Sequence, residues 1–351
     1  MIEQKFYPSG KKNILVTGCA GFLGSHLCDE LIRENHVIGV DNLSGGGGNI
    51  RNIEHLLQNP DFKFLKFDVN EPLNLEDFPE LAGFKIKIQG IQEIYHLACP
   101  TTVKNFEKFK IETIKSNSLG IINLLEMTRK YKAKFLFTSS SVVYGPAREK
   151  DPYFKETDWG QVNFTSPRAC YDEGKRFAES IIITYRELYG LEAKIARVFR
   201  TYGPRMPLFD GQMLPDFVLQ ALNDLPLIIY GDENFRSSFC YVSDIIDGLI
   251  ELMNREELGP INLGHPESYK VVDLAKKIIE FTNSHSEIVF KPPLLFMTPL
   301  GLPDITLAKK KLEWFPLISL EDGLKKMIED IEINRMLFQP FLTEYQKEYE
   351  V

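Results

Sequence analysis

The sequence predicts an α/β fold in which a doubly wound parallel sheet is followed by a smaller C-terminal α/β lobe. From Asn13 onward, short apolar runs alternate with longer amphipathic ones, as strands and covering helices do in parallel sheets. The first such junction carries three glycines, Gly18, Gly21 and Gly24. After about Thr201, proline and glycine become frequent and short strands mix with helices. These observations predict a sheet domain first and a second lobe after it.

The expected elements follow this order along the chain. Strands are predicted at the apolar runs NILVTG, HVIGVD, FKFLKFD, EIYHLA, KFLFTSS and AKIARVF. Helices are predicted at about 21–34, 106–131, 214–223, 242–254, 270–282 and 319–334. We therefore divide the chain into a first domain at 1–200, a lobe at 201–334 from which segments can return to the first domain, and a C-terminal tail at 335–351.

The composition excludes several classes of partner. The chain has 351 residues and a formal charge of −8, so we expect neither nucleic acid nor a membrane as a partner. The five cysteines are odd in number and lack metal-ligand spacing, which favours a reducing compartment and predicts no metal site. The first residues have no apolar core typical of a signal peptide, and no stretch of about 18 apolar residues occurs. We expect a cytoplasmic protein.

The glycine motif predicts a phosphate-binding turn. In VTGCAGFLGSHL the glycines have the spacing GxxGxxG and stand between a strand and a helix. Such a turn needs backbone freedom, a pyrophosphate needs close approach of amides, and a helix start attracts phosphate. Because the motif lies at the first strand-to-helix junction, we expect it to bind a dinucleotide through Gly18, Gly21, Phe22, Leu23 and Gly24.

An acidic residue at the end of the second strand indicates which dinucleotide binds. Asp41 lies 17 residues after Gly24, where a carboxylate can accept hydrogen bonds from an adenosine ribose. The same carboxylate would repel a ribose phosphate, so we expect NAD and not NADP. Asp68, after the third strand, is the candidate partner of the adenine amino group. The remaining residues expected around the cofactor are Asn42, Val69, Leu97 and Ala98.

The catalytic candidates lie on the fifth strand and the helix that follows it. FTSSSVVYG brings Ser139, Ser140 and Ser141 to the carboxyl edge of the sheet, where ligands of such folds bind. In RACYDEGKR, Tyr171 and Lys175 are four residues apart and share one helical face. A tyrosine has a pKa near 10, so it can act as a base at neutral pH only if nearby positive charge lowers that pKa. Lys175 and the positive nicotinamide of NAD are expected to do so.

A strand-tip hydroxyl followed by Tyr-x-x-x-Lys resembles the catalytic arrangement of the short-chain dehydrogenase superfamily. The resemblance implies that Lys175 also holds the nicotinamide ribose, and that Ser140 and Tyr171 bind the same substrate oxygen. The segment WGQVNFTSPRACYDEGKR is similar, more narrowly, to the UDP-glucuronate decarboxylase (UDP-xylose synthase) branch of the extended short-chain dehydrogenases, the NAD-dependent epimerase/dehydratase family. HLACP, TYGPRM, YVSDIIDGLIELMN and PDITLAKKKLEWFP support this resemblance, which runs from about Lys12 to Asp330.

The resemblance implies a Rossmann-like NAD domain, a C-terminal lobe that binds a nucleoside-diphosphate sugar, and a homodimer or higher homo-oligomer formed through the Tyr171 helix. It further implies that Tyr171 removes the proton of the sugar 4-hydroxyl while hydride passes from carbon 4 to NAD. If carbon 5 carries a carboxylate, the resulting β-keto acid can lose carbon dioxide. Other sugars given the same first step yield epimers, dehydration products or a released ketone.

The chain departs from the family pattern at the substrate side. Val142 stands where the branch carries a glutamate thought to assist the later steps, and valine cannot move a proton. Arg200 replaces the usual asparagine, Ser237 falls where an arginine contacts the diphosphate, and PLGLPD lacks another expected arginine. We hypothesise that Arg200, Arg205 and Arg236 form a relocated phosphate clamp.

Three further residues complete the expected substrate contacts: Ser141 beside Val142, Asn117 in the helix expected near the active site, and Tyr241 in the second lobe. These departures leave alternatives open. The protein could be a nucleotide-sugar 4-epimerase or 4-dehydrogenase that does not decarboxylate its substrate. It could also be a catalytically inactive nucleotide-sensing protein, although Ser140, Tyr171 and Lys175 together argue against that reading.

Overall fold

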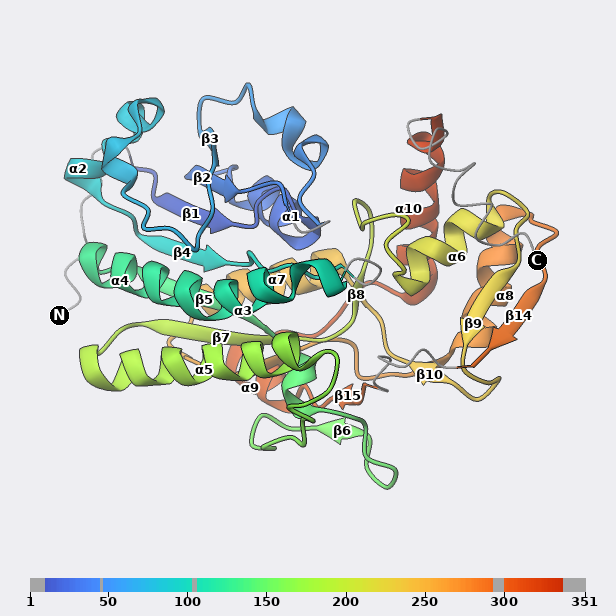
Figure 1. Ribbon diagram of the computed structural model, residues 1–351. Coiled ribbons are helices and arrows are strands. Elements are labelled where there is room, and N and C mark those ends of the chain that lie inside the picture. Colours follow the sequence, from blue (N-terminus) through green and yellow to red (C-terminus); the bar gives the residue numbers. More distant parts are fainter. Residues whose placement is uncertain (1–9, 45–46, 103–105, 293–299, 337–351) are drawn as a thin grey trace.

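A seven-stranded parallel sheet forms the larger part of the molecule in the computed structural model, which describes residues 10–44, 47–102, 106–292 and 300–336 (Figure 1). The strand order is β12-β7-β5-β4-β1-β2-β3. The strands are β1 (Asn13–Thr17), β2 (His36–Asp41), β3 (Phe62–Lys66), β4 (Glu93–His96), β5 (Lys134–Ser140), β7 (Ala193–Val198) and β12 (Ile261–Leu263). The order reverses between β1 and β4, which places a ligand-binding crevice at the carboxyl ends of these strands. The predicted doubly wound sheet is therefore confirmed.

Helices cover both faces of this sheet. On one face lie α1 (Phe22–Leu31) and α7 (Val242–Asn254), which contact each other and the strands. On the other lie α4 (Ile121–Tyr131) and α5 (Ala169–Tyr189). Apolar runs such as NILVT are buried along their whole length, because strands covered on both faces have no solvent side. Two buried apolar clusters result, one under each helical layer.

The helix predicted at 106–131 forms, with an irregularity that the sequence did not predict. A short 3₁₀ turn (Phe106–Phe109) leads into α3 (Lys110–Lys115), and a π-helical turn (Ser116–Gly120) connects α3 to α4. Such turns widen a helix by one residue and occur often at functional sites. This one lies against α5, the helix that carries Tyr171.

The second lobe contains three helices and small two-stranded sheets. Its helices are α6 (Met213–Ala221), α8 (Val271–Thr282) and α10 (Leu320–Ile333). Its strand pairs are β9 (Leu227–Tyr230) with β14 (Ile288–Lys291), and β10 (Arg236–Ser237) with β13 (Tyr269–Lys270). Figure 1 shows these elements together at the right of the molecule, beyond the carboxyl edge of the large sheet.

Smaller elements complete the described structure. They comprise the pairs β8 (Thr201–Tyr202) with β11 (Cys240–Tyr241) and β6 (Tyr153–Phe154) with β15 (Leu302–Pro303), and the helices α2 (Ile86–Gln89) and α9 (Thr306–Leu312). The chain returns from the second lobe to the large sheet, because β12 pairs with β7 at the sheet edge. The proposed tail lies outside the described residues from position 337 onward. No helix in the described ranges is long and apolar enough to cross a membrane.

Candidate active site

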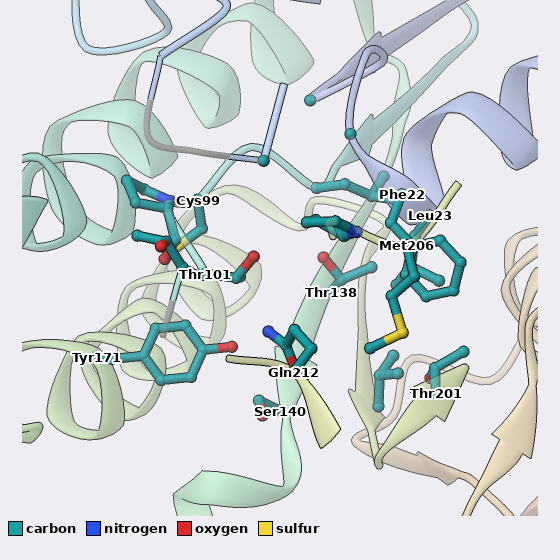
Figure 2. Close-up of a pocket in the computed structure, with 18 of the residues that line it drawn as sticks. Phe22, Leu23, Cys99, Thr101, Thr138, Ser140, Tyr171, Thr201, Met206 and Gln212 are labelled. Carbon is teal, nitrogen blue, oxygen red and sulfur yellow. The ribbon is translucent and has the colours of Figure 1, made fainter. Parts of the chain in front are cut away.

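A cavity of about 590 Å³ lies at the carboxyl edge of the large sheet, and both parts of the chain line it. Residues after β1, β2, β4 and β5 form one wall, and residues of α6, β9 and the segment 206–213 form the other. In Figure 2 the glycine-turn residues Phe22 and Leu23 lie on the opposite side of the cavity from Tyr171 and Ser140. Its size and its position at the strand ends are typical of a binding cleft for small molecules.

The glycine turn has the geometry expected of a phosphate-binding site. Gly18 has a φ of +74°, a conformation that L residues rarely adopt. Gly24 lies so close to the turn that a Cβ would be 2.0 Å from the Gly18 carbonyl oxygen. Gly21 caps α1 without any side-chain hydrogen bond, so no side chain competes for the amides of the first turn. All three glycines line the cavity. The helix start is thus open to an anion.

Asp41 and Asp68, the acidic residues after β2 and β3, line the same cavity as this turn. The Asp41 carboxylate accepts hydrogen bonds from the amides of Ala20 (3.1 Å) and Leu43 (2.8 Å), which fix its orientation. Burial nevertheless raises the pKa of Asp41. The Asn42 side-chain amide donates to Asp68 at 3.1 Å. Val69, Leu97 and Ala98, the remaining residues expected around the cofactor, line the same cavity. A dinucleotide therefore fits the residues present here.

The three residues predicted to be catalytic, Ser140, Tyr171 and Lys175, all line the cavity. Tyr171 lies in the first turn of α5, and its hydroxyl is directed into the cavity on the side where Ser140 and Gln212 lie (Figure 2). Burial raises the pKa of Tyr171 well above its ordinary value, while its hydrogen bond with Ser140 acts in the opposite direction. Loss of water disfavours the phenolate, so the lowered pKa expected for this phenol with NAD bound has to come from the charges of Lys175 and the nicotinamide.

A hydrogen bond to the main chain fixes the position of Lys175 close to Tyr171. Its ammonium donates to the Thr138 carbonyl at 2.9 Å and lies 4.5 Å from the centre of the Phe137 ring. The distance from the ammonium to the centre of the Tyr171 ring is 5.8 Å. The side chain is buried, and burial lowers the pKa of the ammonium. A buried cation so close to the ring stabilises a phenolate more strongly than it would in water.

One of the three predicted clamp arginines lines the cavity. Arg200 is half-buried in the cavity wall, where its Nη1 donates to the Ser237 hydroxyl at 2.9 Å and its guanidinium lies 5.7 Å from the Phe239 ring centre. Burial lowers the pKa of Arg200 to about 10, and the charge of Arg168 acts in the same direction. Two cations close together in an anion-binding cleft indicate that this end of the cavity receives negative charge.

The structure does not bring the other two clamp arginines to the cavity. Arg205 forms a 2.7 Å ion pair with Asp29 of α1, and Arg236 is exposed and donates to Ser268. Neither residue lines the cavity in the described part of the chain. The three-arginine clamp is therefore not assembled, because Arg205 pairs with Asp29 and Arg236 with Ser268.

The other expected substrate residues divide in the same way. Ser141 and Val142 line the cavity next to Ser140. Asn117 lies in the π-helical turn, where its Nδ2 donates to the Thr113 carbonyl (2.8 Å) and contacts the Cys99 sulfur (3.2 Å). Tyr241 is buried with its ring centre 5.5 Å from that of Tyr202. In the described cavity wall neither Asn117 nor Tyr241 appears.

Sequence reasoning missed several residues that the structure places in the wall. Arg168 lines the cavity three residues before Tyr171, with its guanidinium 5.7 Å from the tyrosine ring centre. Cys99 and Gln212 also line it. The signal for Arg168 was its place at the start of the Tyr171 helix, where a side chain faces the strand ends.

No group of three His, Cys, Asp or Glu side chains that could hold a metal ion occurs among the residues that the structure describes.

Comparisons with known proteins show the family to which this chain belongs. The family model of GDP-mannose 4,6 dehydratase matches residues 15–327. UDP-glucuronic acid decarboxylase 1 of Arabidopsis thaliana is 42% identical over 325 residues, which are 92% of this chain and 70% of that protein. UDP-glucuronic acid decarboxylase 1 of Xenopus tropicalis is 40% identical over 319 residues, 91% of this chain and 72% of that protein.

Solved structures with the same fold include two 4-epimerases. UDP-glucose 4-epimerase of Thermotoga maritima, solved with UDP-glucose, has a TM-score of 0.80 and 29% identity over 92% of this chain and 99% of that chain. UDP-glucuronic acid 4-epimerase of Bacillus cereus, solved with UDP-glucuronic acid and NAD, has a TM-score of 0.78 and 27% identity with the same coverage. From the glycine turn, the Ser140–Tyr171–Lys175 trio and these matches, we conclude that the chain belongs to the GDP-mannose 4,6-dehydratase family of extended short-chain dehydrogenases, in which its curated relatives include UDP-glucuronic acid decarboxylases.

Proposed function

We propose that this protein is an NAD-dependent nucleotide-sugar enzyme that oxidises the sugar 4-hydroxyl, most like UDP-glucuronate decarboxylase. The observation that carries the proposal is the convergence of Tyr171, Ser140 and Lys175 on one cavity whose other end is the glycine turn. Relatives at about 40% identity over most of the chain are UDP-glucuronic acid decarboxylases, which supports the same reaction class.

The residues present fit NAD as the cofactor. The amides at the start of α1 would hold its pyrophosphate, and Asp41 would hold the adenosine ribose. Lys175, whose ammonium lies 5.8 Å from the centre of the Tyr171 ring, would hold the nicotinamide ribose. When bound, NAD supplies the hydride acceptor and a positive charge near the phenol. That charge favours ionisation of Tyr171, which burial alone opposes.

The proton transfer belongs to Tyr171. As phenolate it accepts the proton of the sugar 4-hydroxyl, and Ser140 donates a hydrogen bond to the same substrate oxygen. Lys175 stabilises the phenolate before the transfer. Together these groups account for oxidation at carbon 4, which is the step that decarboxylases, epimerases and dehydrogenases of this family share.

The second half of the reaction has two candidates. Loss of carbon dioxide from a 4-keto uronic acid needs no acid at the start, since the ketone accepts the electrons as an enolate. The enolate must then take up a proton. At the position where a proton-donating side chain is expected for this step, the cavity is lined by Val142, a buried apolar residue. This observation favours a 4-epimerase or 4-dehydrogenase as the alternative.

One assay separates these outcomes. The purified protein is incubated with UDP-, GDP- and dTDP-sugars, including UDP-glucuronate, while reduced nicotinamide absorbance and product mass are followed. We expect UDP-glucuronate to lose the mass of carbon dioxide without lasting NADH. Conserved mass with inverted stereochemistry would instead select the epimerase, and stoichiometric NADH the dehydrogenase. Binding of NAD without turnover of any sugar would refute the proposal.

Arg200 is proposed to bind the anionic part of the substrate. Its half-buried guanidinium lines the cavity with the neutral Ser237 as its hydrogen-bond partner, which leaves its charge available to a phosphate or carboxylate. We expect Arg200→Ala to weaken nucleotide-sugar binding by about 10- to 100-fold, as loss of a charge-assisted hydrogen bond predicts. Calorimetric titration of the NAD-loaded protein tests this, and Arg236→Ala is the control for an exposed arginine. Equal affinity of wild type and Arg200→Ala would remove Arg200 from the site.

We further propose that the protein is a homodimer or higher homo-oligomer that acts in the cytoplasm. Six large apolar side chains are exposed on α3, α4 and α5, on the outer surface of one helical layer: Ile111, Ile114, Ile122, Phe177, Ile183 and Leu188. A concentrated apolar helical face of this kind is typical of a subunit interface. All five cysteines are free thiols, which supports a reducing compartment.

A further inference from the structure

A buried ion pair lies behind the catalytic trio, and the mechanism above does not use it. Glu179 of α5 and Arg197 of β7 form two parallel hydrogen bonds, Nε to Oε1 at 3.0 Å and Nη2 to Oε2 at 2.7 Å. Their side chains are 9% and 11% exposed. Two charges in this position lose most of their hydration, so they need further hydrogen bonds to be tolerated.

The Glu179 carboxylate is linked to both elements that carry catalytic groups. Its Oε1 accepts a hydrogen bond from the Ser139 hydroxyl at 2.5 Å, and Ser139 directly precedes Ser140 at the tip of β5. Glu179 also follows Lys175 by one helical turn on α5, where its negative charge raises the pKa of the lysine against the effect of burial. One carboxylate therefore joins the serine strand to the tyrosine–lysine helix.

The other end of the ion pair is anchored as firmly. Arg197 Nη1 donates to the Tyr144 hydroxyl (2.9 Å) and to the Glu156 carbonyl (3.1 Å). Tyr144 in turn donates to the Asn262 side chain at 2.6 Å, on the edge strand β12. Every member of this chain of hydrogen bonds has a partner, and such satisfied buried networks hold their members in one arrangement.

We propose that Glu179, held in place by Arg197, is a positioning residue that fixes Ser140 against the Tyr171–Lys175 helix and supplies the negative charge that faces Lys175. The inference rests on the proposed function, because it assigns a role in that reaction. It predicts that Glu179 affects the turnover step more than substrate binding, since the carboxylate does not line the cavity in the described part of the chain.

The charged and titratable groups that face this lysine are few. On its own helix they are Tyr171 and Glu179. From the neighbouring elements, Cys99 raises the pKa of Lys175, and the charge of Lys175 lowers the pKa of His96. Burial lowers the pKa of His96 to about 3, so that the ring is neutral near neutral pH. Glu179 is thus the carboxylate that faces Lys175, and it is paired with Arg197.

The test compares Glu179→Gln with the double variant Glu179→Gln/Arg197→Gln. In the single variant the negative charge one turn from Lys175 is lost and Arg197 is left without its counter-charge. The net charge around the Tyr171–Lys175 pair becomes more positive, which favours the phenolate. The acid limb of kcat/KM should therefore move to lower pH, with kcat reduced by about 100-fold through misplacement and KM changed by less than about 3-fold. The double variant restores the local charge, so its acid limb should return towards that of wild type while kcat stays low.

Controls separate this role from a general loss of stability. Glu187→Gln removes the same charge from the exposed side of α5 and should behave as wild type. Ser139→Ala cuts the link to β5 without leaving a buried charge, so kcat should fall with no shift of the pH profile. This variant also keeps the inference testable if Glu179→Gln does not fold. Wild-type kcat and an unchanged acid limb in Glu179→Gln, or wild-type kcat in Ser139→Ala, would overturn it.

A readout that needs no turnover keeps the two proposals distinct. The ultraviolet absorbance of ionised tyrosine is titrated with NAD present, and the titration of the matching Tyr171→Phe protein is subtracted. A lower Tyr171 pKa in Glu179→Gln than in wild type supports the inference even if no sugar on the panel is converted. Identical titrations would overturn it, while failure of wild type to convert any sugar counts against the proposed function alone.

Discussion

Tyr171→Phe is expected to reduce kcat on the nucleotide sugar by about 10²- to 10⁴-fold, the usual contribution of a positioned general base. The ring stays in place, since phenylalanine keeps the packing of the aromatic ring at the start of α5 and removes only the hydroxyl that meets Ser140. Single-turnover measurements of reduced nicotinamide, with the protein saturated in NAD and sugar, report the oxidation step directly.

The same experiment contains its own control. NAD affinity and the melting temperature should change little, because Lys175, which lies 5.8 Å from the ring centre, keeps its hydrogen bond to the Thr138 carbonyl. In wild type, activity should rise with pH through the pKa of Tyr171, since the active form is the phenolate and burial opposes its formation. If Tyr171→Phe retained more than about a tenth of wild-type turnover, another group would have to be the base.

The sequence predicted the backbone of the site well, because local patterns encode it. The alternation of short apolar runs with amphipathic ones predicted strands of the large sheet, and the glycine spacing predicted the turn at the start of α1. Tyr171 and Lys175 were predicted to share a face by helical spacing alone, and they do. Features of this kind depend on neighbours in sequence, so a single chain without relatives is enough to find them.

Side-chain partners from distant segments could not be predicted in the same way. Arg205 was expected at the substrate and instead pairs with Asp29, which belongs to α1, far away along the chain. Arg200 and Ser237 were noted as separate departures, whereas the structure shows them in contact at 2.9 Å. The burial that raises the pKa of Tyr171 was not predicted either, because it is a property of the whole fold. Such features depend on how β7, β10 and α1 come together in three dimensions.

Gly24→Ala is expected to abolish NAD binding at the concentrations that saturate wild type. The added Cβ would lie 2.0 Å from the Gly18 carbonyl oxygen and 2.7 Å from its carbon, and both are backbone atoms within the turn. Neither can rotate away, so the turn must open and the first amides of α1 must move from the phosphate position. Over-packing of this kind also destabilises a fold, by about 1–3 kcal/mol.

The matched control is Gly83→Ala, because a Cβ at Gly83 meets no atom within 4 Å. Titration with NAD, followed by calorimetry, should show wild-type affinity for Gly83→Ala and at least about a 100-fold loss for Gly24→Ala, corresponding to about 2.7 kcal/mol. Thermal unfolding without NAD measures the destabilisation separately. With NAD, stabilisation by bound ligand should appear in the control and be absent from Gly24→Ala. A Gly24→Ala protein stabilised by NAD as much as wild type would mean that the pyrophosphate does not rest on this turn.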